Sequence, residues 1–103
     1  MYKRQIEGRP PYSVEFDANR FALAYWRETD PAFAASMSAF FEGMLEHTPS
    51  PVPAGQDVVP YFNDNYQALG PSPAYPWFQA RMIVTASGEK PAPSFAKVVA
   101  GMK

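Results

Sequence analysis

The chain has no cysteine, a single histidine and a charged fraction of only 18% among its 103 residues. Without cysteine there are no disulfide bonds, thiolate metal ligands or thiol nucleophiles, and the composition favours a reducing compartment. Long apolar runs are missing too, because no segment of the sequence approaches the roughly 20 apolar residues that cross a bilayer. We therefore expect a cytoplasmic protein without a membrane span.

Sequence motifs that mark catalysis or nucleic-acid binding are also missing. No serine lies in a Gly-x-Ser-x-Gly elbow, and the 6 glycines are dispersed instead of forming a phosphate-binding loop. Asn63, Asp64 and Asn65 lie together, but Tyr66 follows them where a calcium loop has glycine. The 9 lysines and arginines are scattered, whereas nucleic acids require clustered cations. We expect no cofactor, no metal and no nucleic-acid partner.

Residues 1–11 stand apart from the rest of the sequence. Back-translated from a GTG start codon, residues 1–5 read GTG TAT AAG AGA CAG, which resembles the transposon end sequence used to prepare sequencing libraries. We therefore interpret residues 1–11 as a scar or a disordered N-terminus. Residues 12–103 suit one small domain, and the alternative is that they form the C-terminal part of a larger protein.

Two helices are predicted in the first half of the chain. Asp17 is positioned to cap a helix over residues 18–29, because its carboxylate can accept from free backbone N–H groups. Asp30 and Pro31 begin the next helix, since proline at the first helical position loses no hydrogen bond. This helix should end by His47, because a proline follows two residues later and disfavours helical geometry before it.

Two further helices and two short strands complete the prediction. Asp57 can cap a third helix that ends at Gly70, and Ser94 can cap a fourth near the C-terminus. Apolar and polar residues alternate over residues 12–16 and again over 78–85, which is typical of strands with one buried face.

Aromatic side chains make up 16% of the chain, with 8 Phe, 6 Tyr and 2 Trp. Because each ring buries on the order of 150–250 Å², these residues can supply most of an interior. The sequence therefore predicts a helix-dominant α+β domain, in which about four helices and two short strands surround one core of aromatic and methionine side chains.

His47 is the only imidazole and the only candidate catalytic residue. A neutral imidazole can act as a general base or as a metal ligand. Glu46 is its neighbour in sequence, but adjacent residues on a helix point about 100° apart and do not form a pair. A histidine in the last turn is also favoured by the helix dipole, so we favour a structural role.

Aromatic residues and prolines are interspersed between Pro60 and Phe78, where fixed backbone torsions can preorganise a surface for a ligand or a partner. The candidate binding residues in and beside this segment are Tyr61, Tyr66, Tyr75, Trp77 and Arg81. The alternative interpretation is that these rings cover the helical core and have only a structural role.

Two functions are consistent with these residues. The sparse polar groups favour a non-catalytic interaction or packing module, which binds a protein partner or the remainder of its own chain, in an oligomeric state that the sequence leaves open. The alternative is a small enzyme or ligand-binding domain in which His47, Tyr66, Tyr75 and Arg81 face an aromatic cavity. Convergence of these side chains in one cavity favours the second function, and a solvent-facing His47 favours the first.

Overall fold

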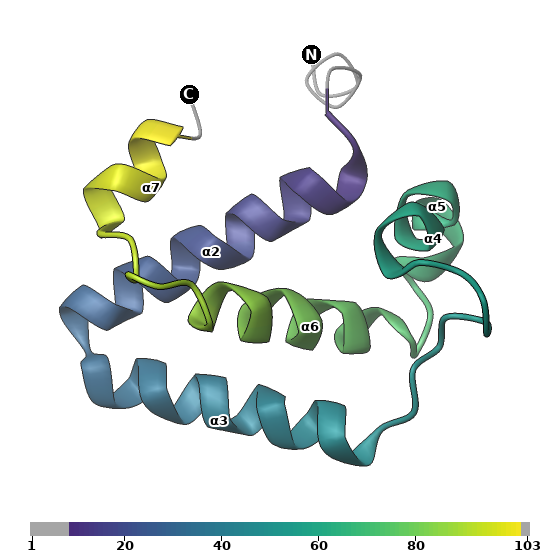
Figure 1. The fold of residues 1–103 in the computed structure, drawn as a ribbon, viewed down its shortest axis with the longest axis horizontal. Helices are drawn as coiled ribbons and strands as arrows, with labels where there is room; N and C mark the ends of the chain where they lie inside the picture. The colour runs from purple at the N-terminus through teal and green to yellow at the C-terminus, as the bar shows by residue number, and fades with distance from the viewer. Residues whose placement is uncertain (1–8, 102–103) are drawn as a thin grey trace.

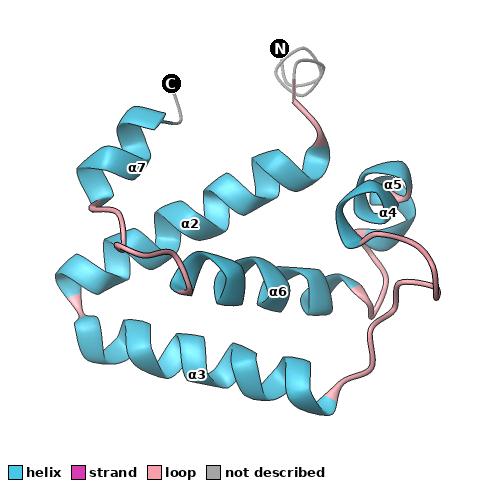
Figure 2. Ribbon diagram, viewed as in Figure 1, coloured by secondary structure: helices cyan, strands magenta, loops and turns pink. Residues whose placement is uncertain are grey.

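The computed structural model describes residues 9–101, and every regular element among them is a helix (Figure 1, Figure 2). The predicted α+β class is therefore wrong, because both expected strands are helical. Of the N-terminal segment 1–11, residues 1–8 lie outside the described range. In chain order the helices are α2 (Pro11–Thr29), α3 (Pro31–His47), α4 (Val58–Asp64), α5 (Tyr66–Leu69), α6 (Tyr75–Ser87) and α7 (Phe95–Gly101).

The helices are arranged around α6. The two longest, α2 and α3, diverge from a short connection at Asp30, and α6 lies between them and packs against both (Figure 1). At the wide end of this arrangement α4 packs against α2, and α4 and α5 share a buried cluster with the start of α6. At the other side α7 packs against α2. None of the helices in the described range is long and apolar enough to cross a membrane.

The strand predicted over residues 12–16 is the start of α2, which begins at Pro11. Proline is favoured at this first position because its missing N–H has no partner there in any helix. Tyr12 and Phe16 are four residues apart, so they share one helix face, and both pack against the buried cluster that contains Phe62. Residues four positions apart share a face in a strand and also in a helix, so the alternation over residues 12–16 does not distinguish the two structures. These residues are helical.

The strand predicted over residues 78–85 lies within α6. A helix that packs on two sides is apolar around most of its girth, and such a helix loses the simple one-face periodicity. The alternation of apolar and polar residues in α6 is therefore accidental. The β-branched residues near the end of the helix made the strand prediction more convincing. The buried residues of α6 are Trp77, Phe78, Ala80, Met82, Ile83 and Ala86.

Two of the four predicted helix caps are confirmed, whereas Asp17, which was expected to cap a helix over residues 18–29, lies inside α2 because that helix already begins at Pro11. The backbone N–H of Phe33 donates to the Asp30 side chain at 3.1 Å, and α3 ends at His47 as expected. Ser94 accepts from the backbone N–H of Lys97 at 3.1 Å at the start of α7. Asp57 precedes α4 without a capping hydrogen bond from its side chain, and the third predicted helix is divided into α4 and α5.

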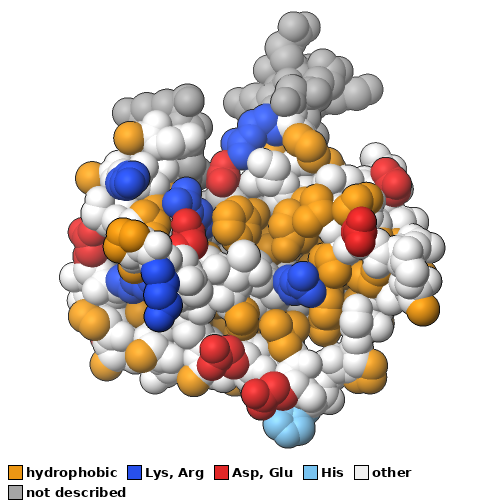
Figure 3. All heavy atoms as spheres, in the orientation of Figure 1, with side chains coloured by type: hydrophobic (Ala, Val, Ile, Leu, Met, Phe, Trp, Pro, Cys, Tyr) orange, Lys and Arg blue, Asp and Glu red, His pale blue; other side chains and the backbone are white. Residues whose placement is uncertain are grey.

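The interior consists of two clusters that share α6. The larger is aromatic and joins α4, α5 and α6 through Phe62, Leu69, Trp77, Phe78 and Met82. The smaller is aliphatic and joins α2, α3 and α6 through Leu23, Ala34, Ile83 and Ala86. Apolar side chains also reach the surface between α2 and α6 on the face drawn in Figure 3.

α7 is joined to α2 by a polar contact and by an apolar one. The backbone N–H of Phe95 donates to the Glu28 carboxylate at 2.8 Å, and Val98 is buried. Arg20 of α2 makes a two-point ion pair, each contact 2.8 Å, with Glu89 in the segment that leads to α7. These contacts place the ring of Phe95 over the exposed side of α2.

Candidate functional site

A partly buried polar cluster lies where α2, α5 and α6 meet. The Glu15 carboxylate on α2 accepts hydrogen bonds from the Tyr66 hydroxyl on α5 at 2.7 Å and the Tyr75 hydroxyl on α6 at 2.9 Å. Gln79, one turn after Tyr75, donates to the same carboxylate at 3.4 Å and accepts from the Asn19 amide at 2.6 Å. Two of the predicted binding residues, Tyr66 and Tyr75, are therefore brought together by a glutamate.

Glu15 and Asn19 were missed because residues 12–16 were interpreted as a strand. In a strand with Tyr12 and Phe16 inward, Glu15 faces solvent. In the helix, Glu15 and Asn19 are four residues apart and share a face, and the backbone carbonyl of Glu15 accepts from the Asn19 amide at 2.9 Å. The available signal was a polar pair one helical turn apart, Glu15 and Asn19, on the segment that also carries Tyr12 and Phe16.

The chemistry of this cluster favours holding helices together. Burial, followed by the hydrogen bond to Glu15, raises the pKa of Tyr75 to about 12, so its phenol stays protonated at neutral pH and continues to donate. The oxygens of Glu15 accept from three donors on α5 and α6, which occupy three of the about four acceptor sites of a carboxylate. The arrangement ties α2 to both α5 and α6.

The other predicted binding residues lie around the aromatic core. The rings of Tyr61 and Phe78 are stacked, with centroids 6.4 Å apart and planes inclined by 19°. Trp77 is buried, and the guanidinium of exposed Arg81 lies 5.9 Å from the centroid of its ring, within the range of a cation–π contact. Neither Tyr61 nor Trp77 joins the Glu15 cluster.

His47 lies at the exposed end of α3, apart from α2, α5 and α6, which build the Glu15 cluster. Its Nδ1 is 2.9 Å from the carbonyl oxygen of Gly43, one turn earlier. Across residues 9–101 no three histidine, aspartate or glutamate side chains gather as metal ligands would.

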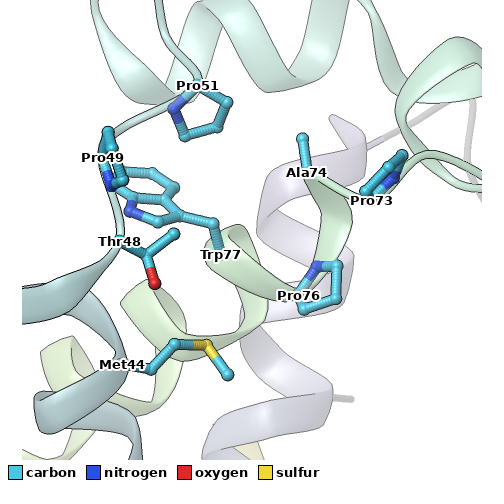
Figure 4. Close-up of a pocket in the computed structure, with 8 residues that line it drawn as sticks. All are labelled: Met44, Thr48, Pro49, Pro51, Pro73, Ala74, Pro76 and Trp77. Carbon is cyan, nitrogen blue, oxygen red and sulfur yellow. The ribbon is translucent and has the colours of Figure 1, made fainter.

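A pocket of about 240 Å³ opens beside Trp77. Figure 4 shows the indole next to Pro49 and Pro51, with Pro73 and Pro76 across the opening. Proline rings hold the backbone torsions of both loops, so these walls are stiff. The complete lining is Met44, Thr48, Pro49, Pro51, Pro73, Ala74, Pro76 and Trp77. Its lining side chains are apolar apart from the hydroxyl of Thr48 and the indole N–H of Trp77. The pocket is smaller than the pockets of about 300–1,000 Å³ that usually enclose small-molecule ligands.

Aromatic rings also form a continuous strip on the outside of α2, α3 and α7. Phe95 contacts Phe21 and Tyr25, with centroids 4.9 and 5.9 Å apart. Tyr25 contacts Trp26 at 5.2 Å, and Trp26 contacts Phe33 at 4.8 Å. We refer to these five residues as the ring strip. Three of its members, on α2 and α3, are exposed, with fractions of 38% for Phe21, 43% for Tyr25 and 46% for Phe33, and Trp26 and Phe95 are partly buried.

Phe40 extends the ring strip along α3. It is 65% exposed and follows Phe33 by seven residues, which is about two helical turns, so both rings lie on the same side of the helix. A groove of about 410 Å³ runs along the opposite flank of α3. Its lining is Arg27, Pro31, Ala34, Ala35, Ser38, Ala39, Glu42 and Ser87.

Comparison of the chain with protein-family models, curated proteins and solved structures gives no match.

Proposed function

We propose that the protein is a non-catalytic interaction module, and that its binding surface is the ring strip together with Phe40. The observation that carries this proposal is the exposure of large rings that already contact one another. Scattered apolar side chains are ordinary on a protein surface, whereas a connected apolar patch marks an interaction site. Aromatic side chains are also the usual anchors of protein interfaces.

The ring strip is suited to binding because its rings are held in place. Each ring of the strip contacts at least one other at centroid distances between 4.8 and 5.9 Å. Ordered rings lose little conformational entropy when a partner covers them, so more of the apolar contact contributes to affinity. His47 is exposed to solvent, which favours an interaction module over a ligand-binding domain in which His47 faces an aromatic cavity.

Site-specific photo-crosslinking in cells tests the proposal. A photoreactive phenylalanine analogue is placed at Phe40, and as a matched control at Gln67, which is exposed on α5. The expected result is a discrete crosslinked protein species from position 40 that is absent from position 67. Equal labelling from both positions, or none from position 40, contradicts the proposal.

A second candidate function, a ligand-binding domain, is favoured by the stiff apolar pocket beside Trp77. With a volume of about 240 Å³, the pocket suits one planar apolar ring. The variant Trp26→Phe leaves Trp77 as the only tryptophan, and iodobenzene should quench its fluorescence in a saturable way. Ala74→Leu fills the pocket and should abolish saturation. Linear quenching that Ala74→Leu leaves unchanged argues against this candidate.

A further inference from the structure

We propose that the partner of the α3 end of this surface is a second copy of the same chain, paired with it antiparallel along α3 about a two-fold axis. This inference rests on the proposed function and names the partner. Three features of α3 support it: an uncharged outer face that displays two rings, a glycine that packing inside the chain does not explain, and opposite charges at the two ends of one flank.

The outer face of α3 has the composition of an interface centre. No charged residue occurs between Pro31 and Phe41, although most of these positions are exposed. Solvated helix faces normally carry charged side chains, whereas the centres of interfaces are depleted of charge and enriched in aromatic rings. The exposed residues of this stretch are Pro31, Ala32, Phe33, Ala35, Ser36, Ala39 and Phe40.

Gly43 indicates close approach from outside the chain. A Cβ atom built on Gly43 meets no other atom within 4 Å, so no intrachain contact requires a glycine there. Glycine within a helix costs roughly 1 kcal/mol relative to alanine. Gly43 continues a seam with Ala32, Ser36 and Ala39, whose spacings of four, three and four are those of a heptad seam. Small side chains on such a seam let two helix backbones approach closely.

The seam separates rings from charges. At about 100° per residue, Phe40 and Glu42 lie on opposite flanks of α3. Phe33 and Phe40 occupy one flank, and the groove on the other flank has Arg27 beside the start of α3 and Glu42 near its end.

A two-fold antiparallel pairing brings the ring flanks of the two copies together and also brings their charged flanks together. Phe33 of each copy then faces Phe40 of the other, and Arg27 of each copy faces Glu42 of the other. A parallel two-fold pairing instead sets the ring flank of each copy against the charged flank of the other, so that rings do not meet rings and Arg27 does not meet Glu42. The surface is therefore complementary to itself in the sense that an isologous dimer requires.

Sedimentation equilibrium of the purified full chain tests the pairing through charge reversal. A concentration-dependent dimer is expected, and Arg27→Glu and Glu42→Arg alone should each weaken it by about tenfold, or about 1.4 kcal/mol. The double variant should restore the dimer. Asp64→Arg, which makes the same change in charge at an exposed residue of α4, is the matched control and should leave the dimer intact. Because Arg27 also donates to the Ser87 carbonyl at 3.3 Å, thermal unfolding is followed in parallel.

Disulfide formation determines the orientation, and the absence of native cysteine makes the readout unambiguous. The single variants Ala32→Cys and Gly43→Cys should not crosslink with themselves, and an equimolar mixture of the two should form the mixed disulfide. Self-crosslinking of either variant without the mixed product overturns the antiparallel pairing. A chain that stays monomeric at millimolar concentration overturns the self-pairing altogether. If that monomer still gives a crosslinked species from position 40 in cells, the proposed function stands and only its partner changes.

Discussion

The aromatic residues of this chain have opposite placements in two regions. Around α4, α5 and the start of α6, the rings of Phe62 and Phe78 are fully enclosed, and the neighbouring polar groups are paired through Glu15. Along α2 and α3, Phe21, Tyr25 and Phe33 contact neighbouring rings but remain exposed, and Phe40 has the largest exposed fraction, 65%. An aromatic-rich composition therefore does not show by itself where rings are structural, because the same residue types build the core in one region and an exposed surface in the other.

The largest expected effect separates an enclosed ring from an exposed one. Phe78→Ala should lower the free energy of unfolding by about 3–5 kcal/mol, because it opens a cavity at a residue with no exposed surface. Phe33→Ala should lower it by about 1 kcal/mol or less, since the ring is about half exposed and its aromatic contact is with Trp26. Chemical denaturation measures both values. Similar losses for the two variants would remove the distinction between the regions, and Phe78→Leu provides a milder probe if Phe78→Ala does not fold.

The next effect concerns the polar cluster that holds the first region together. Glu15→Ala should lower the free energy of unfolding by about 1–3 kcal/mol, because two tyrosine hydroxyls and Gln79 lose their shared acceptor. Glu46→Ala, which removes an exposed glutamate from α3, is the control and should change stability by less than about 0.5 kcal/mol. Equal values from the same denaturation experiment would show that the Glu15 cluster does not stabilise the fold.

A smaller effect compares the helix starts of the two regions. Asp30→Ala should destabilise the protein by about 1 kcal/mol, because the backbone N–H of Phe33 loses its capping partner. Asp57→Ala should have almost no effect, since the Asp57 side chain makes no capping hydrogen bond at the start of α4. Thermal unfolding of both variants gives the comparison, and a larger loss for Asp57→Ala would contradict it.

The smallest effect is a loss of stability at alkaline pH. The pKa of Tyr75 in the folded protein is about 12, above its ordinary value of 10.0, so the folded state holds this proton more tightly than the unfolded chain. The resulting stability is fully present below about pH 10 and is lost as the pH rises through about 12. The melting temperature should fall in that window, and less so for Tyr75→Phe. Tyr12, whose pKa burial also raises, contributes to the same fall in both proteins.

Local chemistry made part of the fold predictable. Asp30 and Pro31 fixed the start of α3 because a capping carboxylate followed by proline has few other uses. Ser94 identified the start of α7 for a similar reason. Such capping signals depend only on residues that are neighbours in sequence, so they can be recognised from the sequence alone.

Packing made the remaining elements unpredictable. α6 is apolar on several sides because it lies between α2 and α3, and this arrangement erased the helical period that would have distinguished it from a strand. The same kind of error at residues 12–16 concealed Glu15, whose partners Tyr66 and Tyr75 are more than fifty residues away in sequence. The exposure of Phe33 and Phe40 depends likewise on which side of α3 faces α6.

The position of α6 has a consequence for how the protein unfolds. Because α6 supplies residues to both buried clusters, neither cluster can open without loosening the helix on which the other depends. The two clusters should therefore melt as one cooperative unit, and the backbone amides in the middle of α6 should be among the slowest to exchange with solvent deuterium.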